Sequence, residues 1–216
     1  MNYRQRILIG ARDLFYNHGI KKITMDGIAR HLSISKKTIY KEFNDKNEIV
    51  VEICKLDVKQ HHKSLTLIQS KATNAIDAIV QIMNYVSKYL DSVNPSYFYD
   101  MNKYHPLAWN VFKQFKLSYV MNSVKEMLHR GQNEELFRTD FNIDIIAKLR
   151  IVEMDAVLNE EFFEPDEYVL SDIHRELLRH YIQGISTIKG HHLINEYFNT
   201  NKDTEFAIDS LSGIKN

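Results

Sequence analysis

Few residues in this 216-residue chain can cross-link it, kink it or loosen it. Its single cysteine, Cys54, excludes an internal disulfide, and beside Ile53 we expect a buried, inert thiol. Three prolines and seven glycines leave long stretches without helix breakers. No run of about 20 apolar residues occurs, and the first residues lack the apolar core of a secretion signal. Because strand alternation is scarce and helical spacing is common, we expect an all-α protein of the cytoplasm.

The chain has no net charge, since 28 basic residues balance 28 acidic ones. This balance hides an asymmetry. Residues 1–63 hold 13 Lys and Arg against 7 Asp and Glu, a net charge of +6, and residues 64–216 carry −6. A basic N-terminal part on an acidic body is expected when one end of a protein meets a polyanion and the other does not.

Residues 24–43 have the apolar spacing of two short helices that share a core. Ile28, Ala29 and Leu32 lie on one helical face, and Ile39 and Phe43 repeat the four-residue interval on the next helix. A residue suited to N-capping precedes each of these two helices and also the helix that follows them. These residues are Thr24, Ser35 and Asp45, the last with Glu48 as a capping box. The pattern predicts a helix-turn-helix.

The second of these helices leaves cationic and hydroxyl side chains off its apolar face. They are Lys36, Lys37, Thr38, Tyr40 and Lys41. Lysines neutralise phosphates, hydroxyls donate to phosphate oxygens, and the first residues of such a helix reach base edges in the major groove. For the lysines alone, a solvated surface on an ordinary helical hairpin is the alternative. The caps, the shared core and the exposed tyrosine together favour DNA binding.

On these features, residues 3–50 resemble the DNA-binding domain of the TetR family of transcriptional regulators. The matching segments are 11–15, 18–19, 23–24, 28–29 and 35–46. The resemblance implies that Thr38, Tyr40 and Lys46 touch backbone phosphates, and that Lys36, Lys37 and Lys41 lie at variable operator contacts. The complete predicted DNA-binding set is Thr24, Ser35, Lys36, Lys37, Thr38, Tyr40, Lys41 and Lys46.

The sequence departs from the family pattern at three positions. Ser33 stands in the turn where the family usually has glycine, and a left-handed backbone there costs a non-glycine residue roughly 1 kcal/mol. Lys37 replaces a small residue common near the helix start, and Glu42 adds an acid to the recognition helix. These departures make the operator sequence harder to infer by analogy.

A first helix is predicted from an apolar stripe of side chains that ends before a glycine. The stripe and its C-terminal cap are Ile7, Ala11, Leu14, Phe15 and Gly19. We expect Arg4 and Arg6 to reach phosphate or a minor groove, as N-terminal arms do, and Arg12 to lie on a solvated surface.

A helix from Asp45 toward Lys63 joins the N-terminal part to the body without a flexible linker, so its tilt would move the recognition helix. We predict a DNA-binding domain over 1–46, a ligand-binding and dimerisation domain over 47–198, and a polar tail over 199–216. Further helices are predicted over about 72–93, through Trp109 and Phe112, from Phe115 to Gly131, and over about 142–159 and 167–188.

The densest aromatic stretch of the body is a candidate ligand pocket. The predicted ligand-binding residues are Tyr97, Met101, Tyr104, His105, Trp109, Phe112, Phe115 and Tyr119. Aromatic side chains make pocket walls, but they also fill ordinary helical cores. The family resemblance implies an inducer pocket in this region and is the main support for the prediction. No ligand class follows, since aromatic walls suit flat, hydrophobic or cationic compounds alike.

Two apolar stripes on the last predicted helices are the candidate homodimer interface. The second apolar stripe is wider than the surface that a single neighbouring helix would cover. In the TetR family, the additional apolar surface is buried in a four-helix bundle between two copies of the chain. The predicted interface residues are Ile146, Leu149, Leu177, Leu178, Tyr181, Ile182 and Ile185. A dimer would place two recognition helices about 34 Å apart, matching a palindrome. A buried helix pair in a monomer is the alternative.

The sequence offers little support for metal, cofactor or enzyme chemistry. The pairs His61-His62 and His191-His192 are adjacent, and helical neighbours point about 100° apart, so neither pair chelates one ion easily. No phosphate-binding glycine loop, nucleophile elbow or HExxH motif occurs. We expect no cofactor, no bound metal and no enzymatic activity.

The sequence therefore predicts a ligand-responsive transcriptional regulator that binds a palindromic operator as a homodimer. By resemblance it is a repressor that a small molecule releases from DNA. The small molecule need only bind with unequal affinity to two forms of the dimer that differ in half-site spacing. One alternative is a helical small-molecule-binding or structural protein whose basic end binds another anion. The other is a constitutive DNA binder without an effector.

Overall fold

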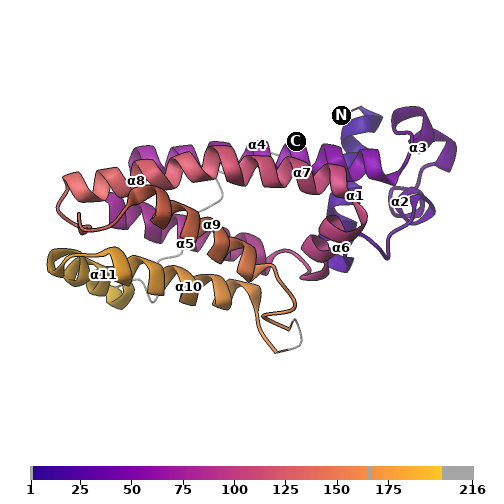
Figure 1. Ribbon diagram of the computed structural model, residues 1–216. Coiled ribbons are helices and arrows are strands. Elements are labelled where there is room, and N and C mark those ends of the chain that lie inside the picture. The colour runs from indigo at the N-terminus through magenta and orange to yellow at the C-terminus, as the bar shows by residue number, and fades with distance from the viewer. Residues whose placement is uncertain (1, 165–166, 201–216) are drawn as a thin grey trace.

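The computed structural model describes residues 2–164 and 167–200, and the regular structure of these residues is helical. Apart from the helices they contain one isolated antiparallel bridge, between Phe137 and Ser186. The all-α prediction is confirmed. No helix in the described part of the chain has the length and apolar character needed to cross a membrane. The helix-turn-helix lies at one end of an elongated body and α11 lies at the other (Figure 1).

Three short helices form the N-terminal end: α1 (Tyr3–His18), α2 (Met25–His31) and α3 (Lys36–Glu42). The predicted caps are present, because Thr24 Oγ1 accepts from the Gly27 N–H at 3.0 Å and Ser35 Oγ accepts from the Thr38 N–H at 3.0 Å. The predicted apolar faces meet in one core. Its fully buried members include Ile7, Ala11, Phe15, Ile28, Ile39 and Phe43.

The turn between α2 and α3 contains a strained residue, as the sequence indicates. Ser33 has a φ angle of +52°, in the left-handed region that favours glycine. The Ser33 N–H donates to Arg30 O and the Ile34 N–H donates to Ala29 O. These bonds close the end of α2 and set the angle at which α3 leaves it, so the turn geometry is kept despite the strain.

Replacing Ser33 with glycine should raise the free energy of unfolding by roughly 0.5–1 kcal/mol, because glycine enters this region without a Cβ clash. Urea or thermal unfolding measures the change. Lys59→Gly, at an exposed position in the middle of α4, is the control and should lower stability by a similar amount. A Ser33→Gly protein that is less stable than the parent would contradict the assignment of strain.

The long helix α4 (Lys46–Lys71) runs from the helix-turn-helix into the body. Asp45 caps it by accepting from the Glu48 N–H at 2.8 Å. The predicted capping box is shifted by one residue, because Glu48 Oε2 accepts from the N–H of Asn44, not from that of Asp45. The helix extends eight residues beyond the predicted end at Lys63 and spans most of the body (Figure 1).

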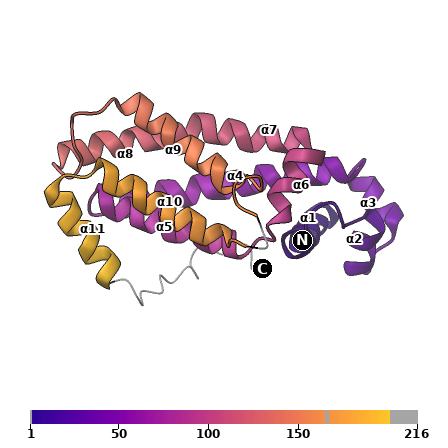
Figure 2. The same cartoon turned by 60° about the horizontal axis from the view of Figure 1, so that its bottom comes forward.

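The body consists of α5 (Ala75–Asp91), α6 (Ser96–Tyr104), α7 (Pro106–Phe115), the π-helical turn η1 (Lys116–Val120), α8 (Met121–Asn133), α9 (Ile143–Val157), α10 (Leu170–Ile185) and α11 (Ile188–Thr200). α7 packs along α4, and α5 packs along α10. Figure 2 shows α5 and α10 side by side. The helices α7 and α8, predicted as separate, form one rod joined through η1.

The predicted helix over 167–188 is wrong at its C-terminal end. α10 stops at Ile185, since the Thr187 N–H donates to Leu136 O and the Arg138 N–H donates to Ile185 O. Thr187 Oγ1 then accepts from the Gly190 N–H at 3.1 Å and begins α11, which the sequence analysis did not predict. Residues 199 and 200 of the predicted tail end α11, and 201–216 lie outside the described residues.

Two apolar clusters fill the interior. The first joins the N-terminal helices to the adjoining ends of α4, α5, α6 and α7, and it contains Cys54, which is 2% exposed. The second lies among α5, α8, α9, α10 and α11. Because the first cluster runs across residue 46, the helix-turn-helix is packed against the body. The domain boundaries given above stay predictions.

Candidate nucleic-acid interface and ligand cavity

α3 lies at the tip of the molecule (Figure 1), and it carries five of the eight predicted DNA-binding residues: Lys36, Lys37, Thr38, Tyr40 and Lys41. Ile39 and Phe43 turn inward, and Tyr40 on the opposite side is 48% exposed. Six of the eight predicted residues are exposed: Thr24, Ser35, Lys36, Lys37, Tyr40 and Lys41. Thr38 and Lys46 are half-buried. The face therefore combines positive charge with hydroxyl donors on a short rigid support.

Two of these side chains have weak partners within the same surface. Lys36 Nζ lies 2.9 Å from Asp26 Oδ1, and both side chains are about half exposed. Thr38 Oγ1 lies 2.8 Å from Ser35 Oγ. Exposed ion pairs of this kind contribute little to stability. Both groups can therefore exchange their present partner for a phosphate oxygen at small cost.

Three other cations near this face are held by backbone oxygens. Lys46 Nζ donates to Ile20 O and Ile23 O, both at 3.0 Å, and burial lowers the pKa of its ammonium group. Arg4 donates to Glu42 O at 2.6 Å, and Arg6 donates to Leu32 O at 2.6 Å. These side chains attach α1 and α4 to the helix-turn-helix, a role that the sequence analysis did not predict.

Asp57 of α4 is the centre of a buried polar cluster that reaches α1. Its carboxylate is 5% exposed, and Oδ1 lies 3.0 Å from Arg12 Nε. The Tyr16 hydroxyl donates to Oδ2 at 2.8 Å and the Tyr97 hydroxyl at 3.5 Å. Burial raises the pKa of Asp57 to about 6, against the opposing effect of Arg12 and the tyrosines. The predicted solvated role of Arg12 is wrong, because this ion pair takes it into the α1–α4 contact.

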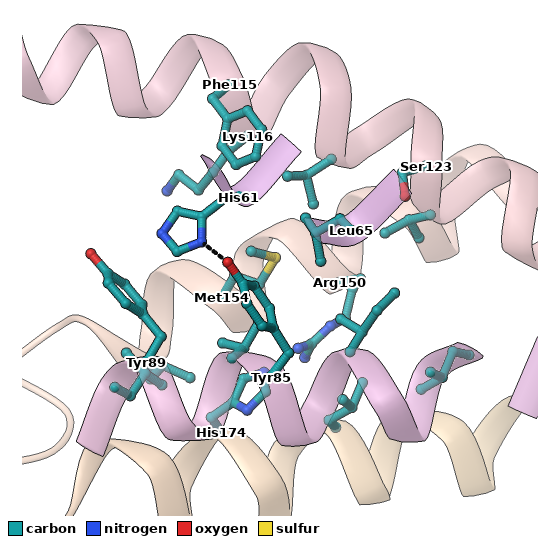
Figure 3. Close-up of a pocket in the computed structure, with 18 of the residues that line it drawn as sticks. His61, Leu65, Tyr85, Tyr89, Phe115, Lys116, Ser123, Arg150, Met154 and His174 are labelled. Atoms are coloured by element: carbon teal, nitrogen blue, oxygen red, sulfur yellow. Dashed lines mark hydrogen bonds between the residues drawn. The ribbon is translucent and has the colours of Figure 1, made fainter. Parts of the chain in front are cut away.

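The same cluster continues into the wall of a cavity. Tyr16 Oη lies 3.3 Å from Tyr89 Oη, and the Tyr89 ring packs edge-on against His61 with centroids 4.4 Å apart. His61 Nδ1 lies 2.7 Å from Tyr85 Oη (Figure 3). Three of these residues, His61, Tyr85 and Tyr89, line the cavity. A continuous set of contacts therefore links the cavity to α1 of the helix-turn-helix.

The cavity has a volume of about 150 Å³ and lies inside the body among α4, α5, the α7–α8 rod, α9 and α10. Most of its wall is apolar. The polar side chains that line it are His61, Tyr85, Tyr89, Lys116, Ser123, Arg150, His174 and Tyr181. An apolar space with a few polar groups is the usual form of a small-molecule site.

Both cavity histidines are held in the neutral state. Burial, with a smaller contribution from Arg12, lowers the pKa of His61 to about 4. Burial, with smaller contributions from Arg150 and Arg175, lowers the pKa of His174 to about 3. His174 Nδ1 lies 3.3 Å from Ser87 Oγ. At neutral pH these rings therefore offer hydrogen bonds but no charge.

The predicted ligand-binding residues are dispersed by the fold. Phe112 and Phe115 line the cavity, and Trp109 lines a separate hollow. Tyr97 belongs to the Asp57 cluster, and Met101 is buried in the first apolar cluster.

The other three predicted residues lie elsewhere. His105 Nδ1 is 2.7 Å from Asn47 Oδ1, Tyr104 is 38% exposed, and the Tyr119 hydroxyl lies 2.8 Å from Thr66 Oγ1. Sequence proximity selected one side of α6 and α7, whereas the cavity draws on side chains from several helices.

Four predicted dimer residues are covered by their own chain. Leu178, Tyr181, Ile182 and Ile185 are 1–6% exposed, because this face of α10 packs into the second apolar cluster. These four residues therefore belong to the core and not to the predicted dimer interface, and Tyr181 also lines the cavity. Leu149 is 46% exposed, and Ile146 and Leu177 are half-buried.

Arg150 and His174 were not among the predicted ligand-binding residues, although helical spacing contains a signal for both. Arg150 lies three residues after the buried Ala147 and seven before the buried Val157, so it falls on the inward side of α9. His174 lies four residues before the buried Leu178 and seven before the buried Tyr181. A cation or imidazole on an inward helix face marks a polar group that needs a buried partner. No cluster of three potential metal ligands occurs among the described residues.

A helix-turn-helix that exposes cations and hydroxyls on its second helix and is followed by a long helix is typical of a DNA-binding protein. Residues 7–53 match the family model described as bacterial regulatory proteins, tetR family. The N-terminal domain is therefore a TetR-family helix-turn-helix domain. No curated relative matches the chain.

Several solved structures share the fold. The fatty acid degradation regulator FadR from Bacillus halodurans is 15% identical, with a TM-score of 0.66 over 85% of this chain and 97% of that one. A Saccharomonospora viridis protein in complex with choline is 19% identical, with a TM-score of 0.69 over 85% and 97%. FadR from Bacillus subtilis in complex with stearoyl-CoA is 13% identical, with a TM-score of 0.63 over 84% and 98%. At these identities the likeness concerns the fold alone.

Replacing Tyr16 with phenylalanine should lower the free energy of unfolding by about 1–3 kcal/mol, because buried Asp57 loses its closest hydroxyl donor. Chemical denaturation measures the effect. Tyr3→Phe, which removes a hydroxyl from an exposed tyrosine of the same helix, should change stability by less than about 0.5 kcal/mol. Equal stability of the two variants would show that the Asp57 cluster does not hold α1 against α4.

Proposed function

We propose that this chain is a ligand-responsive regulator, a repressor that binds a palindromic operator as a homodimer and releases it when a small molecule binds in the body. The exposed cationic and hydroxyl face of α3 carries the proposal. It is supported by the apolar underside of α3, which fixes that face at the tip of α4. The fold of the neighbours and the cavity in the body agree with the effector part of the proposal.

On DNA, Thr38, Tyr40 and Lys46 contact phosphates, and Lys36 and Lys37 lie on or near base edges. Lys36 exchanges Asp26 for DNA, and Lys46 contributes by turning from the carbonyls that now hold it. Thr24, Ser35 and Lys41 complete the surface. Because phosphate contacts release counterions, binding should weaken steeply with salt.

The combined change Lys36→Ala and Thr38→Ala should abolish sequence-selective binding, a loss of roughly 2–4 kcal/mol. Selection and sequencing of bound fragments supplies the operator, and fluorescence anisotropy from 0.05 to 0.2 M salt then gives affinity and salt slope. Circular dichroism checks the helix content.

The matched control removes a cation and a hydroxyl from exposed sites outside the α3 face, with Lys88→Ala and Ser70→Ala. It should bind like the parent. Retained affinity in the α3 variant would overturn the interface. Salt-sensitive binding without sequence preference would favour the alternative in which the basic end binds another anion.

An outward apolar stripe on α9 supports the homodimer. Ile145, Leu149 and Val152 lie at i, i+4 and i+7 and are 64%, 46% and 62% exposed. Such a stripe is costly in water and suits a second helix. A second copy of this chain is the proposed partner, with Ile146 and Leu177 at the edges of the contact. Paired α9 and α10 helices would then set the half-site spacing.

Leu149→Asp should convert the dimer to a monomer, because it places a charge in the centre of the stripe. Light scattering coupled to size exclusion measures the mass, and anisotropy measures the accompanying loss of operator affinity. Leu107→Asp is the control, since Leu107 is 71% exposed on α7 outside the stripe. A parent protein that is already monomeric at micromolar concentration would refute the proposed assembly.

The effector acts through α4 in this proposal. Ligand in the cavity presses on His61 and Tyr89, and the Asp57 cluster carries the displacement to Arg12 and Tyr16 of α1. The ligand shifts the equilibrium only by its difference in affinity for the two tilts of α4. A constitutive DNA binder would show no compound that binds the cavity and releases DNA.

A further inference from the structure

Arg150 is a buried cation with unused donors at the cavity. The residue is 6% exposed, and Nη1 donates to Glu153 Oε2 at 3.0 Å. Among the described residues, Nε and Nη2 make no hydrogen bond, although a guanidinium group has five N–H donors. Figure 3 shows the guanidinium group reaching into the cavity toward His174. A buried charge with free donors is costly unless something accepts from it.

Tyr181 supplies a second unused donor on the same wall. Its side chain is 94% buried, and within the described part of the chain its hydroxyl has no hydrogen-bond partner. The Tyr181 ring centroid lies 5.7 Å from Arg150 Cζ, so the two groups are neighbours. Most buried hydroxyls are paired, and an unpaired one indicates a missing acceptor.

The polar side chains that line the cavity favour an anionic ligand over a cationic one. No aspartate or glutamate belongs to the described residues that line it. Its two cations are Arg150 and Lys116, and Lys116 pairs with Asp155 on the outer side. His61 and His174 are neutral at physiological pH. A positive ligand would find no carboxylate acceptor among the described residues that line the cavity, whereas an anion would find the free donors of Arg150.

The size of the cavity limits the apolar part of the ligand. Its volume is about 150 Å³, and its wall is otherwise aliphatic and aromatic. An apolar cavity of this volume holds a benzene-sized molecule. The apolar body should therefore have on the order of six to eight carbon atoms.

We propose that the cavity binds a small amphiphilic carboxylate whose oxygens accept from Arg150 and Tyr181 and whose apolar body fills the space between Phe112, Phe115 and Val124. Charge-assisted hydrogen bonds from a guanidinium group and a tyrosine hydroxyl recognise a carboxylate with a defined orientation. The inference rests on the proposed function, in which this cavity is the effector site.

Calorimetric titration of the full chain, without DNA, tests the ligand class. The probes are octanoate, 1-octanol and octyltrimethylammonium, which share the chain and differ in the head group. Octanoate should bind at least tenfold more tightly than octanol, and the cation should not bind. Equal affinity for octanol, preference for the cation, or tighter binding of octanoyl-CoA than of octanoate would overturn the proposal.

Tyr181→Phe tests the assignment of the carboxylate partner. It removes an unpaired hydroxyl, so the fold should be kept, and it should lower octanoate affinity roughly tenfold while leaving octanol affinity unchanged. Tyr85→Phe is the control, because that cavity hydroxyl already pairs with His61; its octanoate affinity should change less than that of Tyr181→Phe. An unchanged octanoate affinity in Tyr181→Phe would overturn the assignment.

Arg150→Gln combined with Glu153→Gln removes both charges of the pair together, and it should abolish the preference for octanoate over octanol. A retained preference would overturn the role of Arg150. Operator release is measured separately by anisotropy. Octanoate binding without release would uphold this inference and refute the effector role in the proposed function.

Discussion

One buried carboxylate holds the helix-turn-helix against the body of this molecule. Asp57 lies on α4 and contacts Arg12 and Tyr16 of α1 and Tyr97 of α6. A buried carboxylate is stable only when charge and hydrogen bonds compensate its lost hydration. The three elements must therefore keep their relative positions. Since α1 also packs on α3, the orientation of the DNA-facing helix depends on this cluster.

The cations of the N-terminal end divide into two groups with different roles. Arg4, Arg6 and Lys46 donate to backbone carbonyls and fix the helices to one another. Lys37 and Lys41 remain exposed on α3, beside the exposed hydroxyl-bearing Tyr40. The first group makes the domain rigid, so that the second group can meet a duplex groove without a large loss of conformational freedom. The net positive charge of this end therefore serves both stability and binding.

Local patterns were sufficient for the helix-turn-helix. The caps at Thr24, Ser35 and Asp45, the inward Ile39 and the strained Ser33 follow from spacing and backbone chemistry that act within a few residues. The break at Ser186 was not found from local spacing, because the distant segment 136–138 forms hydrogen bonds with the backbone of Ile185 and Thr187 on either side of it. Ser186 and Thr187 are residues suited to capping a new helix, but the apolar stripe continues through Ile185 and Ile188 and predicts an unbroken helix.

The sequence by itself determined the helical class, the recognition helix and the basic end, because helical period, capping and charge are properties of neighbouring residues. Only the tertiary structure decided which apolar residues face a cavity, a partner or the core. Tyr181 and Leu149 belong to similar stripes, yet one lies at the cavity and the other on the surface. The physical reason is that a helix has several apolar sides in a body of this size, and the packing of α10 against α5 selects which of them is covered.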